Sequence, residues 1–298
     1  MPQWALAEKL LTAASVPFKT VLTNYKFHAT QLAYEAAGQG YRHFLAVGGD
    51  GSVHETLNGI LRFADEAGVD PEAFTLAVIP IGSGNDWIKS LGVPHDTRYV
   101  VDRLSAGSFA RQDVVRVETQ PFPAAEGAGV SVAYMANIGG VGFDSHVCER
   151  VNALKEQGRR GKLIYLGALI HTMFHTKAFH TRIVADGELV FDGEAYSVAF
   201  GNGRYSGGGM RQVPLSEIDD GLLDYMVVPK AGLLQILFQI PRLYNGTVNE
   251  SGLLKTGRCH VLEMSGDNIV EIDGEVVGAL PLRLTMTGRQ FGVLVGDR

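Results

Sequence analysis

The stretch His43–Leu61, HFLAVGGDGSVHETLNGIL, decides the fold of the first part of this chain. Phe44 to Val47 is a short apolar run, which is typical of a buried strand. The run ends at the glycine turn GGDGS, after which apolar residues recur at helical spacing. Ser52 and Glu55 have the spacing of a capping box, so we expect the helix to begin at Ser52. The stretch therefore predicts a strand, a glycine turn and a helix.

The glycine turn also has the properties of an anion site. Gly48, Gly49 and Gly51 allow a phosphate or another backbone segment to approach closely. The N–H groups at the start of a helix favour negative charge. Asp50 would repel a phosphate unless a cation bridges the two, so it indicates Mg²⁺ or a polarised hydroxyl. A tight turn with Asp50 as a local cap is the plainer interpretation of the same residues.

A second copy of the pattern favours the ligand site. The stretch Thr75–Leu91, TLAVIPIGSGNDWIKSL, again predicts a strand, a turn of small residues holding one acid, and a short helix that Pro94 ends. Two such units indicate a parallel α/β layer. Ligands of such sheets bind at the carboxyl ends of the strands, where both turns would lie.

These two stretches resemble the diacylglycerol kinase catalytic family, which includes bacterial lipid kinases and sphingosine kinase relatives. GGDGSVHETLNG is similar to the family's GGDGT-x-x-E-x-x-N-G signature, and PIGSGNDWIKSLG to its P-x-G-T-x-N-D-x-A-x-x-L-G block. Ser52 and Ser83 replace threonines, and both keep the hydroxyl. The resemblance continues through Asp220-Gly221 and Asp273-Gly274-Glu275 and covers nearly the whole chain. GGDG alone is shared with NAD kinases and phosphofructokinase relatives.

The resemblance implies a role for each matching residue of the first part. Asp50 and the loop around it would hold the phosphates of ATP and Mg²⁺, and Ser83 would contact nucleotide or phosphate. Asp86 and Asp113 would join an acidic network around the catalytic Mg²⁺, although an interdomain cap is an equally good interpretation of Asp113. The nucleotide-binding set that the resemblance implies is Gly48, Gly49, Asp50, Gly51, Ser52, Glu55 and Ser83.

Two motifs of the second part carry implied roles of their own. Asp220, with Glu217 and Leu222, resembles a family loop that binds a structural Mg²⁺; without the resemblance, a β-turn with a solvated Asp220 would be favoured. Glu275 of the D-G-E block would be the general base that deprotonates a lipid hydroxyl. The same D-G pair is also a standard hairpin signal, and both interpretations are compatible.

Composition limits the function classes. The 298 residues are enough for two domains, and 46% hydrophobic with 19% charged residues is a globular composition. A net charge of −6 argues against a nucleic-acid partner. The two cysteines favour a reducing cytoplasm, and no apolar run approaches the ~20 residues of a membrane span. A lipid kinase with this composition would visit the membrane surface as a peripheral protein. A monomer and a homodimer are both compatible with the sequence.

The sequence pattern changes near residue 113, where many short runs rich in β-forming residues begin. We expect an α/β nucleotide-binding domain over 1–112, of three layers and similar to NAD kinase and phosphofructokinase, joined by a returning C-terminal strand at 287–298. Residues 113–286 would form an antiparallel β-sandwich lipid-substrate domain, with the active site in the cleft between the domains. The apolar run Ala231–Leu243 interrupts the strands, and we expect it to pack in the core rather than to anchor the protein to a membrane.

The beginning of the chain departs from the family pattern. Trp4–Ala14 and Ala29–Ala37 predict helices, and Phe18–Leu22 predicts a strand. The family's opening strand, with its asparagine-proline turn, has no match, and we expect that the chain starts late. The sequence thus predicts an ATP- and Mg²⁺-dependent lipid kinase of phospholipid metabolism, acting on an acceptor such as diacylglycerol. The alternatives are an NAD kinase-like enzyme with a soluble acceptor and a non-catalytic nucleotide-binding regulatory protein.

Overall fold

The computed structural model describes residues 2–82, 84–123, 129–157, 167–168, 171–172 and 175–297. The chain divides into two compact units, Met1–Val114 with Gly288–Arg298 and Val115–Thr287. We call them the α/β unit and the β unit. Two strands, β3 (Phe109–Gln120) and β12 (Glu275–Leu294), contribute residues to both units. Gly288 has a φ of 70° and lies at the residue where β12 passes from one unit to the other.

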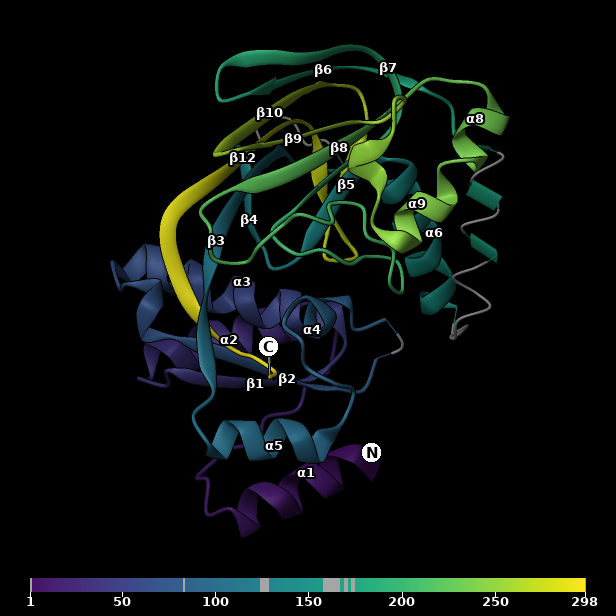
Figure 1. Ribbon diagram of the computed structural model, residues 1–298. Helices are drawn as coiled ribbons and strands as arrows, with labels where there is room; N and C mark the ends of the chain where they lie inside the picture. The colour runs from purple at the N-terminus through teal and green to yellow at the C-terminus, as the bar shows by residue number, and fades with distance from the viewer. Residues whose placement is uncertain are drawn as a thin grey trace. The chain divides into compact units, whose positions relative to one another are not determined.

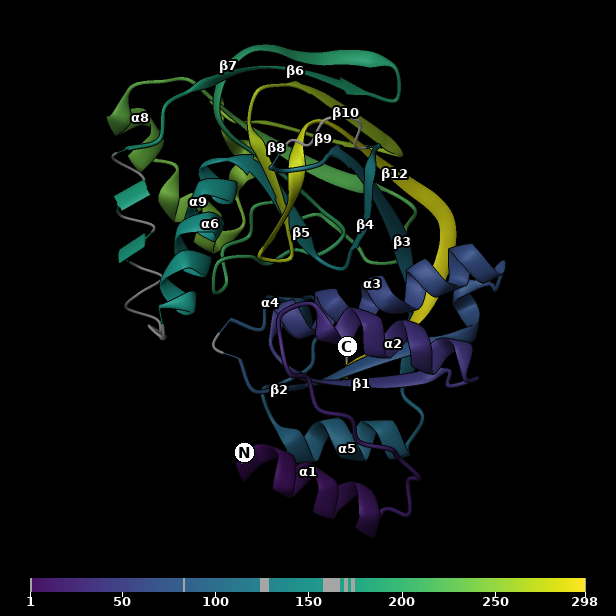
Figure 2. The ribbon, with the colours of Figure 1, turned by 180° about the vertical axis from the view of Figure 1, so that it is seen from behind.

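The α/β unit is built on a small parallel sheet. β1 (His43–Gly48) pairs with β2 (Thr75–Pro80), and β2 pairs with the last part of β12 through Gly292 and Val293. Helices α2 (His28–Gly38) and α3 (Asp50–Ala67) cover one face, and α5 (Thr97–Ser105) covers the other (Figures 1 and 2). α1 (Pro2–Ala13) packs against α5. The short elements are η1 (Pro71–Ala73) and α4 (Asp86–Ser90).

Apolar periodicity explains how α2 and α3 pack. Ala33 and Ala37 of α2 meet Ile60 and Ala64 of α3 over Phe74, and all five side chains are buried. Gly59 is required at this contact, because a Cβ there would lie 2.3 Å from the carbonyl oxygen of Thr30. These buried contacts fix α3 against the sheet and so position the turn that precedes it.

The β unit is an antiparallel sheet whose pairing closes on itself (Figure 1). The order is β12, β10 (Val261–Gly266), β6 (Phe179–Ala185), β7 (Glu188–Gly201), β5 (Ile138–Gly142) and β11 (Ile269–Ile272), which pairs again with β12. β8 (Leu223–Pro229) joins β7 to β9 (Lys255–Cys259), and β4 (Ser131–Met135) pairs with β3. The helical elements whose bounds fall in the described part of this unit are α6 (Phe143–Glu156), α8 (Leu233–Leu237), α9 (Ile240–Asn245) and η2 (Val248–Glu250).

The predicted fold class, an α/β part followed by an antiparallel β part, is confirmed. Several local predictions were wrong. Phe18–Leu22 forms no strand, and much of its apolar surface is exposed. A strand is stable only when it pairs with another strand, and this segment pairs with none that the structure describes. α3 begins at Asp50, with Gly49 in an extended conformation before it, and not at Ser52. Of the described helices, none has the length and apolar character needed to cross a membrane.

Candidate functional site

The two glycine turns of the α/β unit touch each other. Ile81 N donates to Gly48 O at 2.8 Å, and Gly82 N donates to the same oxygen at 3.3 Å. A Cβ on Gly82 would lie 2.8 Å from the Cα of Gly49, which leaves no room for any other residue. The parallel pairing of β1 and β2 brings the turns together, since each turn follows the carboxyl end of its strand. Close backbone packing is therefore one reason for these glycines.

The acids of the two turns are also neighbours. Asp50 accepts hydrogen bonds from the backbone N–H groups of Asp86 and Trp87, both at 3.2 Å, and so caps the start of α4. A Cβ on Gly84 would lie 3.2 Å from Oδ2 of Asp50 and 3.9 Å from Oδ2 of Asp86. Oδ1 of Asp86 pairs with Nζ of Lys89 at 2.6 Å. Because glycine has no side chain, the carboxylates of Asp50 and Asp86 both border the small space beside Gly84.

Asn85 lies between the two turns, and its Oδ1 would be 2.7 Å from a Cβ on Gly82 and 3.4 Å from a Cβ on Gly49. Its side chain is buried, and its Nδ2 donates to Gly82 O at 2.6 Å. Within the described part of the chain, Oδ1 of Asn85 has no hydrogen-bond partner, which is costly for a buried acceptor. Sequence reasoning missed Asn85 as a site residue, although it lies inside the second motif. Carboxylate and amide oxygens fit a hard cation such as Mg²⁺.

A cation here would need further ligands. Across the described ranges, no group of three or more His, Cys, Asp and Glu side chains is arranged to hold a metal ion. Mg²⁺ is commonly held by one or two carboxylates together with the phosphates of a nucleotide, and the carboxylates of Asp50 and Asp86 match that arrangement. The residues present therefore fit a magnesium nucleotide better than a metal held by protein alone.

The remaining residues of the first turn have structural contacts. Ser52 lies in the first turn of α3, and its Oγ would be 2.1 Å from a Cβ on Gly48. Gly51 is the second residue of α3. Glu55 does not complete the predicted capping box, because its Oε2 accepts from Ala29 N at the start of α2, at 3.0 Å. Ser83, also predicted, lies outside the described residues.

Asp113 is buried on β3 and contacts the last strand. Its Oδ1 accepts from Nε2 of Gln290 at 2.8 Å. The preceding residue, Gln112, accepts from Nε1 of Trp87 at 3.0 Å and so links β3 to α4, which begins at Asp86. Asp113 therefore helps to hold β12 in the α/β unit, and its role in an acidic network stays a prediction.

In the β unit, the D-G-E block forms the hairpin turn between β11 and β12. Asp273 and Gly274 have φ values of 53° and 84°, the pair of positive angles that a type I′ turn requires. The Asp273 carboxylate is buried and accepts from Asn137 N at 2.8 Å and Ala136 N at 2.9 Å. These hydrogen bonds hold the turn in place. Glu275 is the residue directly after the turn and is half-buried.

Two acids near this turn, the buried Glu271 and the half-buried Asp144, were missed by the sequence reasoning. Burial, and then the charge of Asp144, raise the pKa of Glu271 well above its ordinary value. Burial also raises the pKa of Asp144, against the hydrogen bonds it accepts from Ser197 and from Gln212 at 2.7 Å. Oε2 of Glu271 accepts from Gly274 N at 3.1 Å. The one available signal was a glutamate in the middle of the buried strand Ile269–Ile272.

In the loop predicted to bind a structural Mg²⁺, arginine side chains contact the carboxylates. Oδ1 of Asp220 accepts from Leu222 N at 3.0 Å, and Oδ2 pairs with Arg258, which also binds Asp224 at 3.1 Å. Glu217 lies 3.8 Å from Arg204. The Arg258 guanidinium therefore neutralises the Asp220 carboxylate, as the ammonium group of Lys89 does for Asp86. Metal binding by Glu217, Asp220 and Leu222 stays a prediction.

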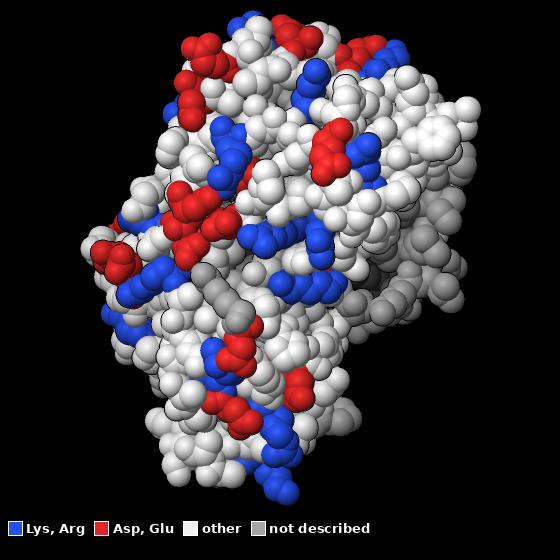
Figure 3. Space-filling view, in the orientation of Figure 1, with Lys and Arg blue, Asp and Glu red and all other residues white. Residues whose placement is uncertain are grey.

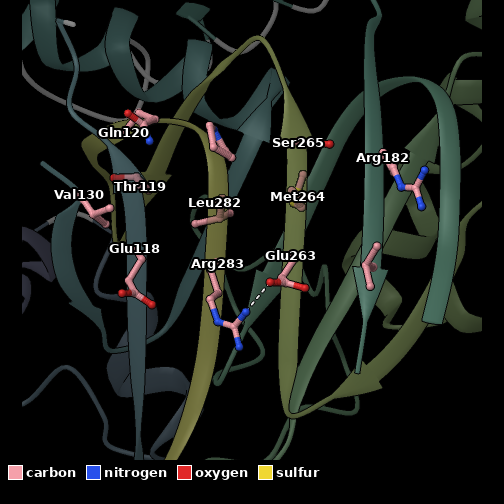
Figure 4. Close-up of a pocket in the computed structure, with 12 residues that line it drawn as sticks. Glu118, Thr119, Gln120, Val130, Arg182, Glu263, Met264, Ser265, Leu282 and Arg283 are labelled. Carbon is pink, nitrogen blue, oxygen red and sulfur yellow. Dashed lines mark hydrogen bonds and ion pairs between the residues drawn. The ribbon is translucent and has the colours of Figure 1, made fainter. Parts of the chain in front are cut away.

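The β unit also has a pocket of about 380 Å³ on its outer face (Figure 4). Met264 and Leu282 are buried at its base, while Glu263 and Arg283 pair with each other across neighbouring strands. Glu118, also at the pocket, pairs with Arg116 at 2.7 Å. The pocket contains none of the predicted site residues, and these paired charges are typical of a solvated sheet face.

Comparison with known proteins agrees with the motifs. Residues 2–117 match the family model described as diacylglycerol kinase catalytic domain, and residues 137–295 match the YegS C-terminal NAD kinase beta sandwich-like domain. Over 256 residues, 85% of this chain and 77% of the relative, the sequence is 29% identical to the diacylglycerol kinase of Bacillus subtilis. It is 25% identical to that of Mycobacterium tuberculosis over 268 residues, 89% of this chain and 81% of the relative.

A solved structure shows the same fold. A crystal structure of a diacylglycerol kinase from Bacillus anthracis superposes with a TM-score of 0.69 and 22% identity, covering 97% of this chain and 88% of that one. The expected resemblance is confirmed by the two family models, which together match most of the chain. The chain belongs to the family of diacylglycerol kinase catalytic proteins with a YegS-type C-terminal domain, a family of lipid kinases.

Proposed function

We propose that the protein is an ATP- and Mg²⁺-dependent lipid kinase that transfers the γ-phosphate of ATP to a lipid hydroxyl such as that of diacylglycerol. The observation that carries this proposal is the approach of the Asp50 and Asp86 carboxylates to the same space beside Gly84. Family membership and the names of the relatives support the acceptor class.

The α/β unit would supply the nucleotide and cation residues. Phosphoryl transfer depends on neutralising the charge of the phosphates and on positioning the attacking hydroxyl. Bound Mg²⁺ would supply the charge neutralisation. Asp50 and Asp86 would hold it from the two sides of the space beside Gly84. The N-terminus of the 18-residue helix α3, with Gly51 and Ser52 in its first turn, would favour the phosphates.

Glu275 would act as the general base. The lipid hydroxyl gives its proton to the Glu275 carboxylate, its oxygen forms a bond to the γ-phosphorus, and the bond from that phosphorus to the β–γ bridging oxygen breaks to release ADP. Asp273 serves this step indirectly, because its hydrogen bonds to Ala136 and Asn137 hold the turn that carries Glu275.

An acceptor screen tests the proposal. Purified protein is incubated with radiolabelled ATP, Mg²⁺ and mixed micelles of diacylglycerol, a sphingoid base, ceramide or a polyprenyl alcohol, and in parallel with NAD. We expect label in a lipid, and its loss in Glu275→Gln but not in Glu188→Gln, a matched change at an exposed position of β7. Label in NAD alone, or equal activity of both variants, would overturn the proposal.

A further inference from the structure

The segment that carries α8 and α9 leaves large apolar side chains in solvent, against the expectation that Ala231–Leu243 packs in the core. Leu234 on α8 and Phe238, the residue directly after α8, are 69% and 75% exposed. They are four residues apart and Phe238 keeps helical backbone angles, so both lie on one side of this segment. Tyr244 on α9 is 57% exposed. Such exposure is costly in water, and it occurs here on two consecutive elements of the chain.

The inner side of the segment already has apolar and hydrogen-bonding contacts with the β unit. Leu243 packs against a buried cluster of the β unit that includes Val213 and Met226. Its carbonyl oxygen accepts from Arg211 N at 2.6 Å, which ties α9 to the loop before β8. At α8, Gly232 N donates to Oε1 of Gln235 at 3.0 Å. The fold therefore uses Leu243 as the apolar anchor and turns Leu234 and Phe238 outward. Both ribbon views show α8 at the edge of the β unit (Figures 1 and 2).

The charges along this segment have one sign. From Pro229 to Asn249 the sequence contains Lys230 and Arg242 and no acidic residue, although the whole chain has a net charge of −6. The acids that face these cations come from neighbouring segments, Glu194 at 2.5 Å from Lys230 and Glu250 at 3.8 Å from Arg242. The surface in the region of α8, at the upper right of Figure 3, shows neither charge. Both ion pairs are exposed and therefore weak, so the two cations can exchange these acids for anionic headgroups beside the apolar tip.

We propose that the α8–α9 surface, formed by Leu234, Phe238, Tyr244 and Arg242, docks on a lipid bilayer that contains anionic headgroups. Leu234 and Phe238 enter the boundary between headgroups and acyl chains, and Arg242 stays at headgroup level. This inference deepens the proposed function and rests on it, because a lipid acceptor resides in the bilayer and must be reached there.

A bilayer suits this surface better than a second copy of the chain. A stable protein interface buries about 800 Å² on each partner. An aromatic side chain buries ~150–250 Å², so three apolar side chains of this kind fall short of that area. Insertion into a bilayer needs no complementary partner surface, and each apolar side chain that enters the acyl region contributes separately.

Vesicle binding tests the proposal without using kinase activity. The full chain is sedimented with phosphatidylcholine vesicles, with and without phosphatidylglycerol, in the absence of nucleotide. We expect wild-type binding that increases with phosphatidylglycerol, and a loss of about tenfold or more in the partition coefficient for Leu234→Ser/Phe238→Ser. The matched control Leu189→Ser/Val190→Ser changes two exposed apolar residues of β7 and should bind as the wild type does.

The outcomes separate this inference from the proposed function. Equal binding of the α8 variant and the wild type, or an equal loss in the β7 control, would overturn the docking surface. So would a wild-type dimer that the α8 variant dissociates, with no vesicle binding by either. With a short-chain, water-soluble diacylglycerol, the α8 variant should phosphorylate at the wild-type rate, and only its activity on vesicles should fall. Vesicle binding without any lipid phosphorylation would leave the surface intact and refute the kinase proposal.

Discussion

Asp50 combines a structural and a proposed catalytic role, and substitution can separate the two. Its carboxylate accepts the backbone N–H groups of Asp86 and Trp87, each at 3.2 Å. Asp50→Ala removes both acceptors at once. Asp50→Asn keeps one oxygen as an acceptor but removes the negative charge on which a cation would depend. The two variants therefore differ in stability, while both should lose activity.

The expected cost of each change follows from these contacts. A hydrogen bond at the long end of the usual range contributes about 1 kcal/mol, and a carboxylate at a helix N-terminus adds about 0.5 kcal/mol. Asp50→Ala should therefore lower the free energy of unfolding by roughly 2–3 kcal/mol. Asp50→Asn should lower it by roughly 1–2 kcal/mol, since one bond can persist. At about 2–4 °C per kcal/mol, both changes are measurable in Tm.

Urea denaturation and a lipid kinase assay, run on the same preparations, give the two readouts. We expect kcat to fall by about a hundredfold or more in Asp50→Asn, although that variant stays folded. Asp65→Asn, in the same helix and paired with Arg289 at 2.6 Å, is the matched control and should keep its activity. Full activity of Asp50→Asn would refute the cation role. An Asp50→Ala variant as stable as the wild type would refute the cap.

Three further predictions concern stability. Gly59→Ala forces a methyl group against the α2 backbone and should cost about 1–3 kcal/mol in urea unfolding, whereas Gly252→Ala, which meets nothing within 4 Å, should be neutral; equal effects would contradict the α2–α3 packing. Asp273→Ala removes the carboxylate that accepts from two buried N–H groups and should cost about 2–5 kcal/mol, and a neutral result would show that the turn is held otherwise. Burial raises the pKa of Asp224 from 3.8 to about 6, so its folded form binds a proton more tightly than its unfolded form. Its contribution to the free energy of unfolding is complete below pH 3.8 and is lost as the pH rises through 6, so Asp224→Asn should flatten the pH dependence of stability in that window; an unchanged slope would exclude this assignment.

The sequence carried most of the information where local chemistry decides the structure. The apolar runs before Gly48 and before the second turn form the predicted strands β1 and β2, and the D-G pair forms the predicted hairpin. Small residues and acids at the ends of these strands could be recognised because a tight turn restricts the residue types that fit. The proximity of Asp50 and Asp86 follows from the parallel pairing of the two strands.

Features that depend on residues far away in the sequence could not be predicted from local sequence patterns. Glu55 has capping-box spacing, but Ala29 of α2, far away in sequence, offers its N–H instead. The expected C-terminal strand at 287–298 is the last part of one long strand, β12, which continues through Gly288 although that glycine has a φ of 70°. Leu234 and Phe238 look like core residues by composition, and only the anchoring of Leu243 shows which side of the segment faces inward.

The most direct test of the central claim follows both products of one reaction. With purified protein, ATP, Mg²⁺ and diacylglycerol in mixed micelles, we expect ADP and phosphorylated lipid to appear in equal amounts. We also expect that neither product forms above background when Glu275→Gln replaces the wild type. ADP release that does not depend on lipid, or lipid phosphorylation that survives this substitution, would contradict the account.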